Sequence, residues 1–279
     1  MSNQFGAKAA RAFLKFGVAL LVPALLCLAL FVPPKVAAAP ELPVDLKLRM
    51  KQPKSIANAD DLARWMTYYY VHPQPELVVP AVLFADKNDL LTGDYVAPFQ
   101  AFLSGVFAQN PDKVAVWFNA IAPMKESNRT LLLTSVWWSN TSQGKQMLQQ
   151  LCKTLPAKPQ AEFRKQIDSD PPQIVQMPIE GTAVLDMLWG CYCATGDEKY
   201  VRRLMTCLPW AEVDQKNLSK MMLASAAKWS LTSNCEQHPQ VLEICRKVAA
   251  SDVCLKKFLE PVIAEVTNRR RTASTGSGQ

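Results

Sequence analysis

Short turn signals divide most of this chain into paired apolar segments of helical length. The clearest pair is "ADDLARWMTYYYV" and "ELVVPAVLFA", which a His-Pro-Gln-Pro run separates. Asn58 stands where an N-cap belongs, and Asp60 and Asp61 fall in the first turn, where acidic side chains interact favourably with the helix dipole. Asn-Gly and Asp-Gly hairpin turns are absent from the sequence, and few segments alternate in polarity, so strands are not predicted. The chain is therefore predicted to be all-α.

The same arrangement of two helices around a short turn recurs along the body of the chain. Five hairpins are predicted, three of them within residues 58–155 and two within 182–268, and a last helix over 251–267 has Ser251 as its N-cap. The predicted helix pairs are 59–71 with 76–85, 97–109 with 114–122, 128–139 with 145–155, 182–194 with 199–208, and 217–237 with 241–250.

Two of these hairpins superpose without a gap. The matched residues are Trp65 with Trp189, Tyr68 with Tyr192, Leu77 with Val201, and Leu83 with Cys207. Helical hairpins in series bury surface that no single hairpin can bury, which is how helical solenoids fold. In this general form residues 58–250 resemble tetratricopeptide-type repeat proteins, and the resemblance implies an α-solenoid of stacked hairpins. The spacing is irregular and the Gly and Ala consensus positions are not reproduced, so no ligand-binding residue is carried over.

Aromatic residues on the first helices of the hairpins have two interpretations. At about 100° per residue, Trp65, Tyr68 and Tyr69 share one broad arc with Leu62, whereas Tyr70 lies round the side. A wide apolar arc is typical of a helix packed on two sides, so a core role is favoured over an aromatic binding patch. If the patch exists, its candidate residues are Trp65, Tyr69, Tyr70, Trp138, Trp189 and Tyr192.

The N-terminal segment indicates export. Residues 1–38 carry four basic residues, no acidic residue and an apolar run over 16–32, followed by small residues that offer a cleavage site after Ala38. The segment is predicted to be either a signal peptide that is removed or a retained membrane anchor. Both alternatives place the body outside the cytoplasm, periplasmic or secreted, and residues 39–57 are predicted to be an extended spacer.

The basic charge of the chain lies mainly at its ends. Of the net charge of +7, four charges belong to residues 1–38 and three to the run Arg269–Arg271, so the rest nets about zero. A nucleic-acid-binding protein would carry a basic stripe on its folded surface, so nucleic acid is not predicted as a partner. Residues 269–279 are predicted to be a disordered basic tail. Membrane contact is expected only through the N-terminal segment, if it is retained.

A proline-rich segment separates the third and fourth hairpins. Residues 156–181 contain prolines that rule out one continuous helix, so they are predicted to be a linker between two helical lobes or a strap laid along the surface. The apolar stretch "PPQIVQMPI" favours the strap.

The histidines and cysteines do not form a recognisable catalytic or metal-binding motif. His72 and His238 each precede Pro-Gln at a predicted turn, so they are interpreted as turn residues. Cys191 and Cys193 are two residues apart on a helix and point to nearly opposite sides, so no metal or other cofactor is predicted. Cys235 and Cys245 flank the last hairpin turn and are the candidates for a disulfide in an oxidising compartment.

Two functions follow as hypotheses, and a third, a membrane-tethered assembly factor, depends on whether the N-terminal segment is retained. The first is a non-enzymatic protein-binding or scaffold module of the cell envelope, whose partner is another envelope or secreted protein. The second is an envelope glycan hydrolase that uses two carboxylates in a helical cleft. Glu126-Ser127 resembles the Glu-Ser of lytic transglycosylases, but the Gly-Leu-Met-Gln element that follows it in that family is missing. No catalytic residue is therefore assigned.

Overall fold

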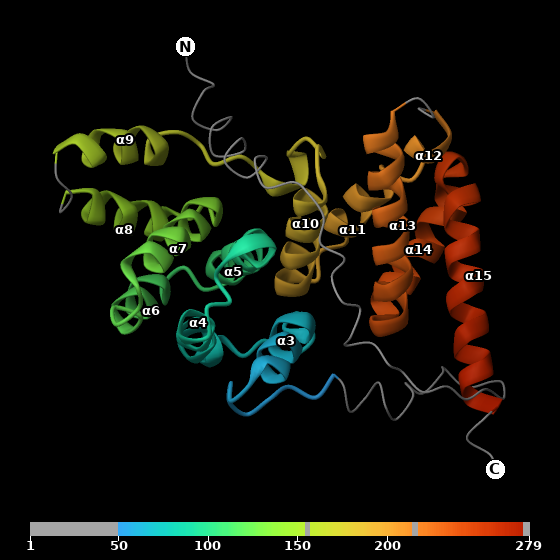
Figure 1. Ribbon diagram of the computed structural model, residues 1–279, viewed down its shortest axis with the longest axis horizontal. Helices are drawn as coiled ribbons and strands as arrows, with labels where there is room; N and C mark the ends of the chain where they lie inside the picture. The colour runs from blue at the N-terminus through green and yellow to red at the C-terminus, as the bar shows by residue number, and fades with distance from the viewer. Residues whose placement is uncertain (1–49, 154–156, 214–216, 276–279) are drawn as a thin grey trace.

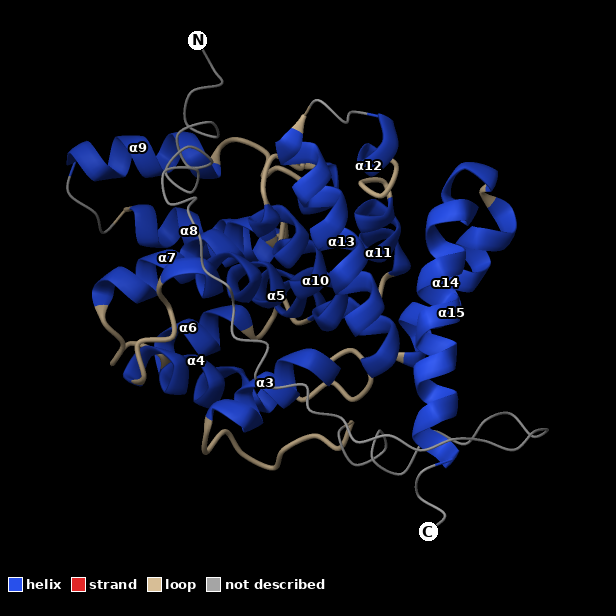
Figure 2. Ribbon diagram, turned by 45° about the vertical axis from the view of Figure 1, so that its right-hand side comes forward, coloured by secondary structure: helices blue, strands red, loops and turns tan. Residues whose placement is uncertain are grey.

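The structure is all-helical, as predicted. A computed structural model of the chain describes residues 50–153, 157–213 and 217–275, and over these ranges it contains α-helices and short 3-10 helices but no strand (Figures 1 and 2). The predicted leader and the first part of the spacer lie outside the described residues. Residues 50–57 contain no helix.

The five predicted hairpins correspond to the helix pairs α3/α4, α5/α6, α7/α8, α10/α11 and α13/α14. The α-helices are α3 (Ala59–Tyr68), α4 (Val78–Lys87), α5 (Val96–Gln109), α6 (Val114–Ala120), α7 (Glu126–Trp138), α8 (Ser142–Cys152), α9 (Ala157–Ile167), α10 (Thr182–Thr195), α11 (Glu198–Met205), α12 (Trp210–Val213), α13 (Leu218–Gln237), α14 (Pro239–Ser251) and α15 (Val253–Thr275). The 3-10 helices are η1 (Pro75–Leu77), η2 (Gly93–Tyr95) and η3 (Ile174–Gln176).

Side-chain caps define several helix starts. Asn58 Oδ1 accepts a hydrogen bond from the Asp61 backbone N–H at 2.9 Å, as an N-cap does. The prediction that Ser251 caps the last helix is wrong. Ser251 is the final residue of α14, and Asp252 Oδ1 instead accepts from the backbone N–H groups of Cys254 and Leu255, at 2.9 and 3.0 Å. A carboxylate oxygen has two lone pairs, so Asp252 Oδ1 can accept from both N–H groups at once.

Helices α5 and α10 form the most extensive helix–helix contact and lie side by side at the centre of the molecule (Figure 1). Their backbones approach closely because glycine or alanine occupies contact positions on both helices. A Cβ added to Gly105 of α5 would lie 2.7 Å from the Ala194 Cβ of α10, and one added to Gly190 of α10 would collide with the Pro98 carbonyl oxygen of α5. Glycine at these positions therefore sets the spacing of the two helices.

Two hydrophobic cores meet along this contact. One core is built by residues of α3–α8 with the end of α9, and the other by residues of α10, α11 and α13–α15. Ala97 and Ala101 of α5 belong to the second core, while Ala194 of α10 belongs to the first. The contact also joins the second and fourth hairpins, which are not consecutive along the chain.

The proline-rich segment contains a helix that the sequence analysis did not predict. Helix α9 covers residues 157–167 and packs on α8, and its only proline, Pro159, lies in the first turn, where the missing N–H is not needed. Prolines 171 and 172 follow its end. Beyond them Ile174 and Ile179 are buried in the second core, so residues 168–181 lie along the protein.

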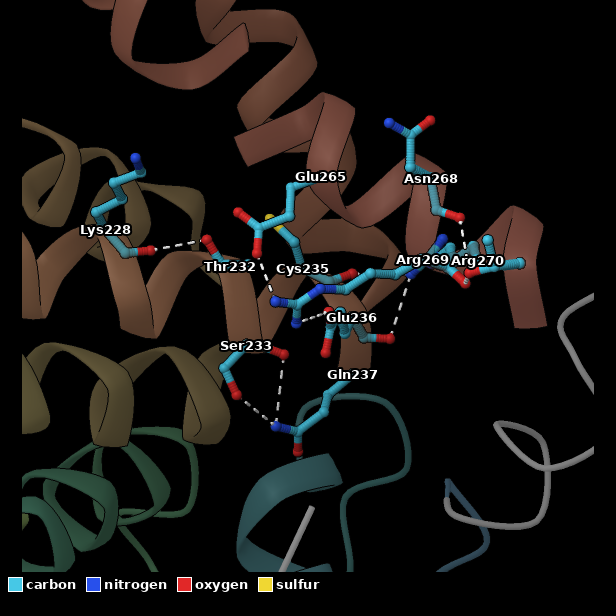
Figure 3. Close-up of polar contacts among 11 residues, drawn as sticks. Lys228, Thr232, Ser233, Cys235, Glu236, Gln237, Glu265, Asn268, Arg269 and Arg270 are labelled. Carbon is cyan, nitrogen blue, oxygen red and sulfur yellow. Dashed lines mark hydrogen bonds and ion pairs between the residues drawn. The ribbon is translucent and has the colours of Figure 1, made fainter. Parts of the chain in front are cut away.

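The prediction of a disordered tail beginning at residue 269 is wrong for residues 269–275, which continue α15. Arg269 bonds Glu236 at 2.6 Å and Glu265 at 2.5 Å, and Arg270 donates to the Cys235 carbonyl at 2.8 Å (Figure 3). Arg270 thereby satisfies a carbonyl of the last turn of α13, which has no partner within its own helix. Arg269 and Arg270 therefore connect α15 to the end of α13.

We expect Gly190→Ala to destabilise the protein, since the added methyl group meets backbone atoms of α5 that only a shift of the whole helix can move. The free energy of unfolding should fall by about 1–3 kcal/mol, measured by urea denaturation. Gly181→Ala is the control, because a Cβ at Gly181 would meet nothing within 4 Å. It should cost less than about 1 kcal/mol. Equal stability of the two variants would contradict the proposed close approach.

Candidate functional site

The structure places most of the predicted aromatic binding residues in the core. Trp65, Tyr69, Trp189 and Tyr192 are buried, and Trp65 and Tyr69 both stack edge-on against Phe102 of α5. These four side chains fill the wide apolar arcs of their helices and offer no surface to a ligand. Tyr70 and Trp138 are partly buried against the second core.

Tyr70 takes part in a polar junction that joins three distant segments. It follows α3, and its backbone N–H donates to the Cys193 carbonyl of α10 at 2.9 Å. Its hydroxyl lies 3.1 Å from His238 Nδ1 and donates to Gln240 Oε1 at 3.1 Å. His238 is the residue between α13 and α14, so the junction brings together α3, α10 and the last hairpin.

One tautomer of His238 satisfies both hydrogen bonds of the junction. When the Tyr70 hydroxyl donates its one proton to Gln240 Oε1, it accepts from His238, and on this basis we assign the imidazole proton to Nδ1. The His238 Nε2 atom is then an acceptor, and it has no hydrogen-bond partner within the part of the chain that the structure describes. The rings of Tyr68, Tyr70 and Tyr192 surround the imidazole, with centroids 5.2, 5.7 and 6.1 Å from it.

Burial shifts the pKa values of these groups away from neutrality. Burial lowers the pKa of His238 to about 4, and burial raises the pKa of Tyr192 to about 12 and that of Tyr70 further above its usual range. A general acid or base works best with a pKa near the operating pH. The junction therefore holds neutral hydrogen bonds at neutral pH, and we interpret it as a structural connection.

The glycan-hydrolase hypothesis requires a carboxyl with a raised pKa paired with a second carboxylate in one cleft. Desolvation by neighbouring atoms raises the pKa of the Asp186 carboxyl to about 6, with a smaller effect of the Asp94 charge, although the residue as a whole stays exposed. A hollow of about 330 Å³ lies between α8 and α9 and has Asp168 as its one carboxyl. Asp186 and Asp94 do not line it, so the carboxylate pair that such an enzyme needs is not formed there.

The cysteines are mostly buried thiols. Burial raises the pKa of Cys191 and Cys193 to about 12, which disfavours the thiolate that binds metals. In residues 50–153, 157–213 and 217–275, no three His, Cys, Asp or Glu side chains gather closely enough to hold a metal ion. Cys235 and Cys245 lie side by side, with their Sγ atoms 3.4 Å apart. The structure thus brings the predicted disulfide candidates together.

Helix α13 has an exposed apolar face that the sequence analysis did not identify. Leu218, Met222 and Trp229 are 69, 64 and 65% exposed, and at about 100° per residue they fall within about 40° of one another. The buried residues Leu223, Ala224, Ala227, Leu231 and Cys235 lie on the opposite side of the same helix. Because α13 is apolar on both sides, periodicity alone did not show which side faces solvent.

We call Leu218, Met222 and Trp229 the α13 face. Monomeric proteins commonly expose single apolar side chains, whereas an aligned set of large ones marks an interaction site. Tryptophan and methionine are also enriched in protein interfaces. The α13 face is therefore the candidate binding site of this protein.

Comparisons with protein-family models, with curated proteins and with solved structures found no match. The helices that the structure describes include none with the length and hydropathy needed to span a membrane.

The His238 pKa predicts a pH-dependent stability. Unfolded His238 protonates below about pH 6.5, whereas folded His238 stays neutral to about pH 4. The unfolded state thus binds the proton more readily, and the free energy of unfolding should fall by about 3 kcal/mol as the pH drops from 6.5 to 4. Urea denaturation across this range measures the loss. His238→Gln should remove this part of the pH dependence, and the exposed His72 provides the control His72→Gln, which should retain it.

We expect Tyr70→Phe to lower the free energy of unfolding by about 1–3 kcal/mol, because the buried His238 N–H loses its acceptor. Tyr95→Phe is the matched control. Tyr95 is 66% exposed, so its substitution should change stability by less than about 0.5 kcal/mol. If Tyr70→Phe is as neutral as the control in thermal and urea unfolding, the junction does not stabilise the fold.

Proposed function

We propose that this protein is a non-enzymatic binding module of the cell envelope, and that it binds another exported protein through the α13 face. The observation that carries the proposal is the alignment of Leu218, Met222 and Trp229 on the solvent side of a helix whose other side is already buried. An apolar stripe on a rigid helix suits a partner with a hydrophobic groove, which anchors side chains one and two turns apart.

Export is part of the proposal. The apolar run over residues 16–32 with basic residues before it supports transfer of the body out of the cytoplasm, either with the leader removed or with the leader retained as an anchor. The partner is therefore expected to be a periplasmic, secreted or membrane-anchored protein.

We also propose that the chain has the stacked-hairpin architecture of tetratricopeptide-type proteins. The recurrence of five helical hairpins supports it. The α5–α10 contact differs from a linear stack, in which each repeat touches only its neighbours, because it joins the second hairpin to the fourth.

A photo-crosslinking residue in place of Trp229 tests the proposed binding site. In the native envelope it should yield an adduct with one protein partner, whereas the same residue in place of Val116 should not. Val116 is the control because it is 66% exposed on α6, away from the α13 face. Absence of an adduct at position 229 would contradict the proposal, and so would release of soluble sugar fragments from cell-wall glycan by the purified protein.

Once the partner is identified, Trp229→Ala should raise the dissociation constant of the complex by about 30-fold, since an interface tryptophan contributes about 2 kcal/mol. Val116→Ala should leave the dissociation constant unchanged. Both substitutions remove exposed side chains, so both should change stability by less than about 0.5 kcal/mol. Isothermal titration calorimetry and urea denaturation of the same samples separate a loss of binding from a loss of folding.

A further inference from the structure

Cys235 and Cys245 face each other across the α13–α14 hairpin. Cys235 lies in the last turn of α13 and Cys245 lies in the second turn of α14, with the His238–Pro239 turn between them. Both residues are fully buried, and their Sγ atoms are in contact at 3.4 Å. The two helices are antiparallel neighbours, so the contact follows from the hairpin itself and not from a flexible loop.

The backbone on the other side of Cys235 is also held in place. Arg270 of α15 donates to the Cys235 and Glu236 carbonyl oxygens at 2.8 and 3.3 Å, and Arg269 bonds the Glu236 side chain (Figure 3). The last turn of α13 is thus fixed from α15 while its thiol points at α14. A pair of thiols held in contact in this way needs little rearrangement to form a bond.

We propose that Cys235 and Cys245 form a disulfide when the chain folds in an oxidising compartment, and that this bond locks the hairpin carrying both the α13 face and His238. The bond forms by exchange with a donor disulfide, such as oxidised glutathione or a thiol–disulfide oxidoreductase. One cysteine thiolate attacks the donor and releases one donor thiol, and the second thiolate then attacks the mixed disulfide and releases the other. Each protein thiol gives up one proton, and the donor takes up the two electrons.

The surroundings of the pair determine when the bond forms. Contact with Cys245 and burial raise the pKa of Cys235 well above its usual range, so little Cys235 thiolate exists once the hairpin has closed. Both thiols are fully buried in the closed hairpin, so a donor disulfide reaches them before burial is complete, and afterwards the bond is shielded from reductants. The bond depends on the hairpin geometry and not on whether a protein binds the α13 face.

Refolding the full chain in oxidised glutathione buffer, followed by alkylation under denaturing conditions, tests the inference without relying on export. Mass spectrometry of the tryptic peptide over residues 229–246, which carries both cysteines, should show no alkylation and a mass about 2 Da below that of the unalkylated reduced peptide. Cys254 is exposed and serves as the internal control, because in the same sample it should carry glutathione or the alkyl group and no bond to another cysteine. Alkylation of both Cys235 and Cys245, or a bond from either of them to a different cysteine, would overturn the proposal.

Two single variants confirm the assignment. Cys235→Ala should leave Cys245 open to alkylation, and Cys245→Ala should leave Cys235 open, whereas Cys254→Ala should keep the linked peptide. The oxidised wild-type protein should also unfold at a higher urea concentration than its reduced form, and this shift should vanish in either single variant. A shift that persists in both variants would show that another bond is responsible.

Discussion

The contact between α5 and α10 determines how the rest of the chain is arranged. Two helices can approach this closely only where side chains are absent or small, and Gly105 and Gly190 supply that surface on either side. The contact joins hairpins two and four, so it fixes the first core against the second.

The polar junction follows from that arrangement. With α10 held against α5, its C-terminal half lies beside the end of α3, where the Tyr70 backbone bonds the Cys193 carbonyl. Gly196, in a left-handed conformation with φ +69°, ends α10 next to the Tyr70 ring, and a Cβ there would lie 3.0 Å from it. The tyrosine can then reach His238. The buried imidazole thus connects the segment after α3 to the turn between α13 and α14.

The helical hairpins could be predicted because their apolar periodicity and turn residues are local signals. The α5–α10 contact could not, since no local pattern shows that Gly105 pairs with a helix about 80 residues later. The burial of the two histidines could not be predicted for the same reason. His72 and His238 both precede Pro-Gln, yet one is exposed and the other fully buried, because burial depends on which helices pack over each turn. The run Arg269–Arg271 was predicted to be a tail for the same reason, because Glu236 and Cys235, which Arg269 and Arg270 bond, lie on α13.

The α13 face remains the feature that folding does not account for. The buried side of α13 already supplies the contacts that hold the last hairpin, so Leu218, Met222 and Trp229 add nothing to the core. Exposing three large apolar side chains in line carries a cost in solubility, which polar residues at the same positions would avoid. Such a surface is expected where a second molecule covers it. The packing of the Cys235 thiol against Cys245 and the arginine contacts of α15 hold the end of that helix from two sides, and a helix held in this way would lose little entropy on association.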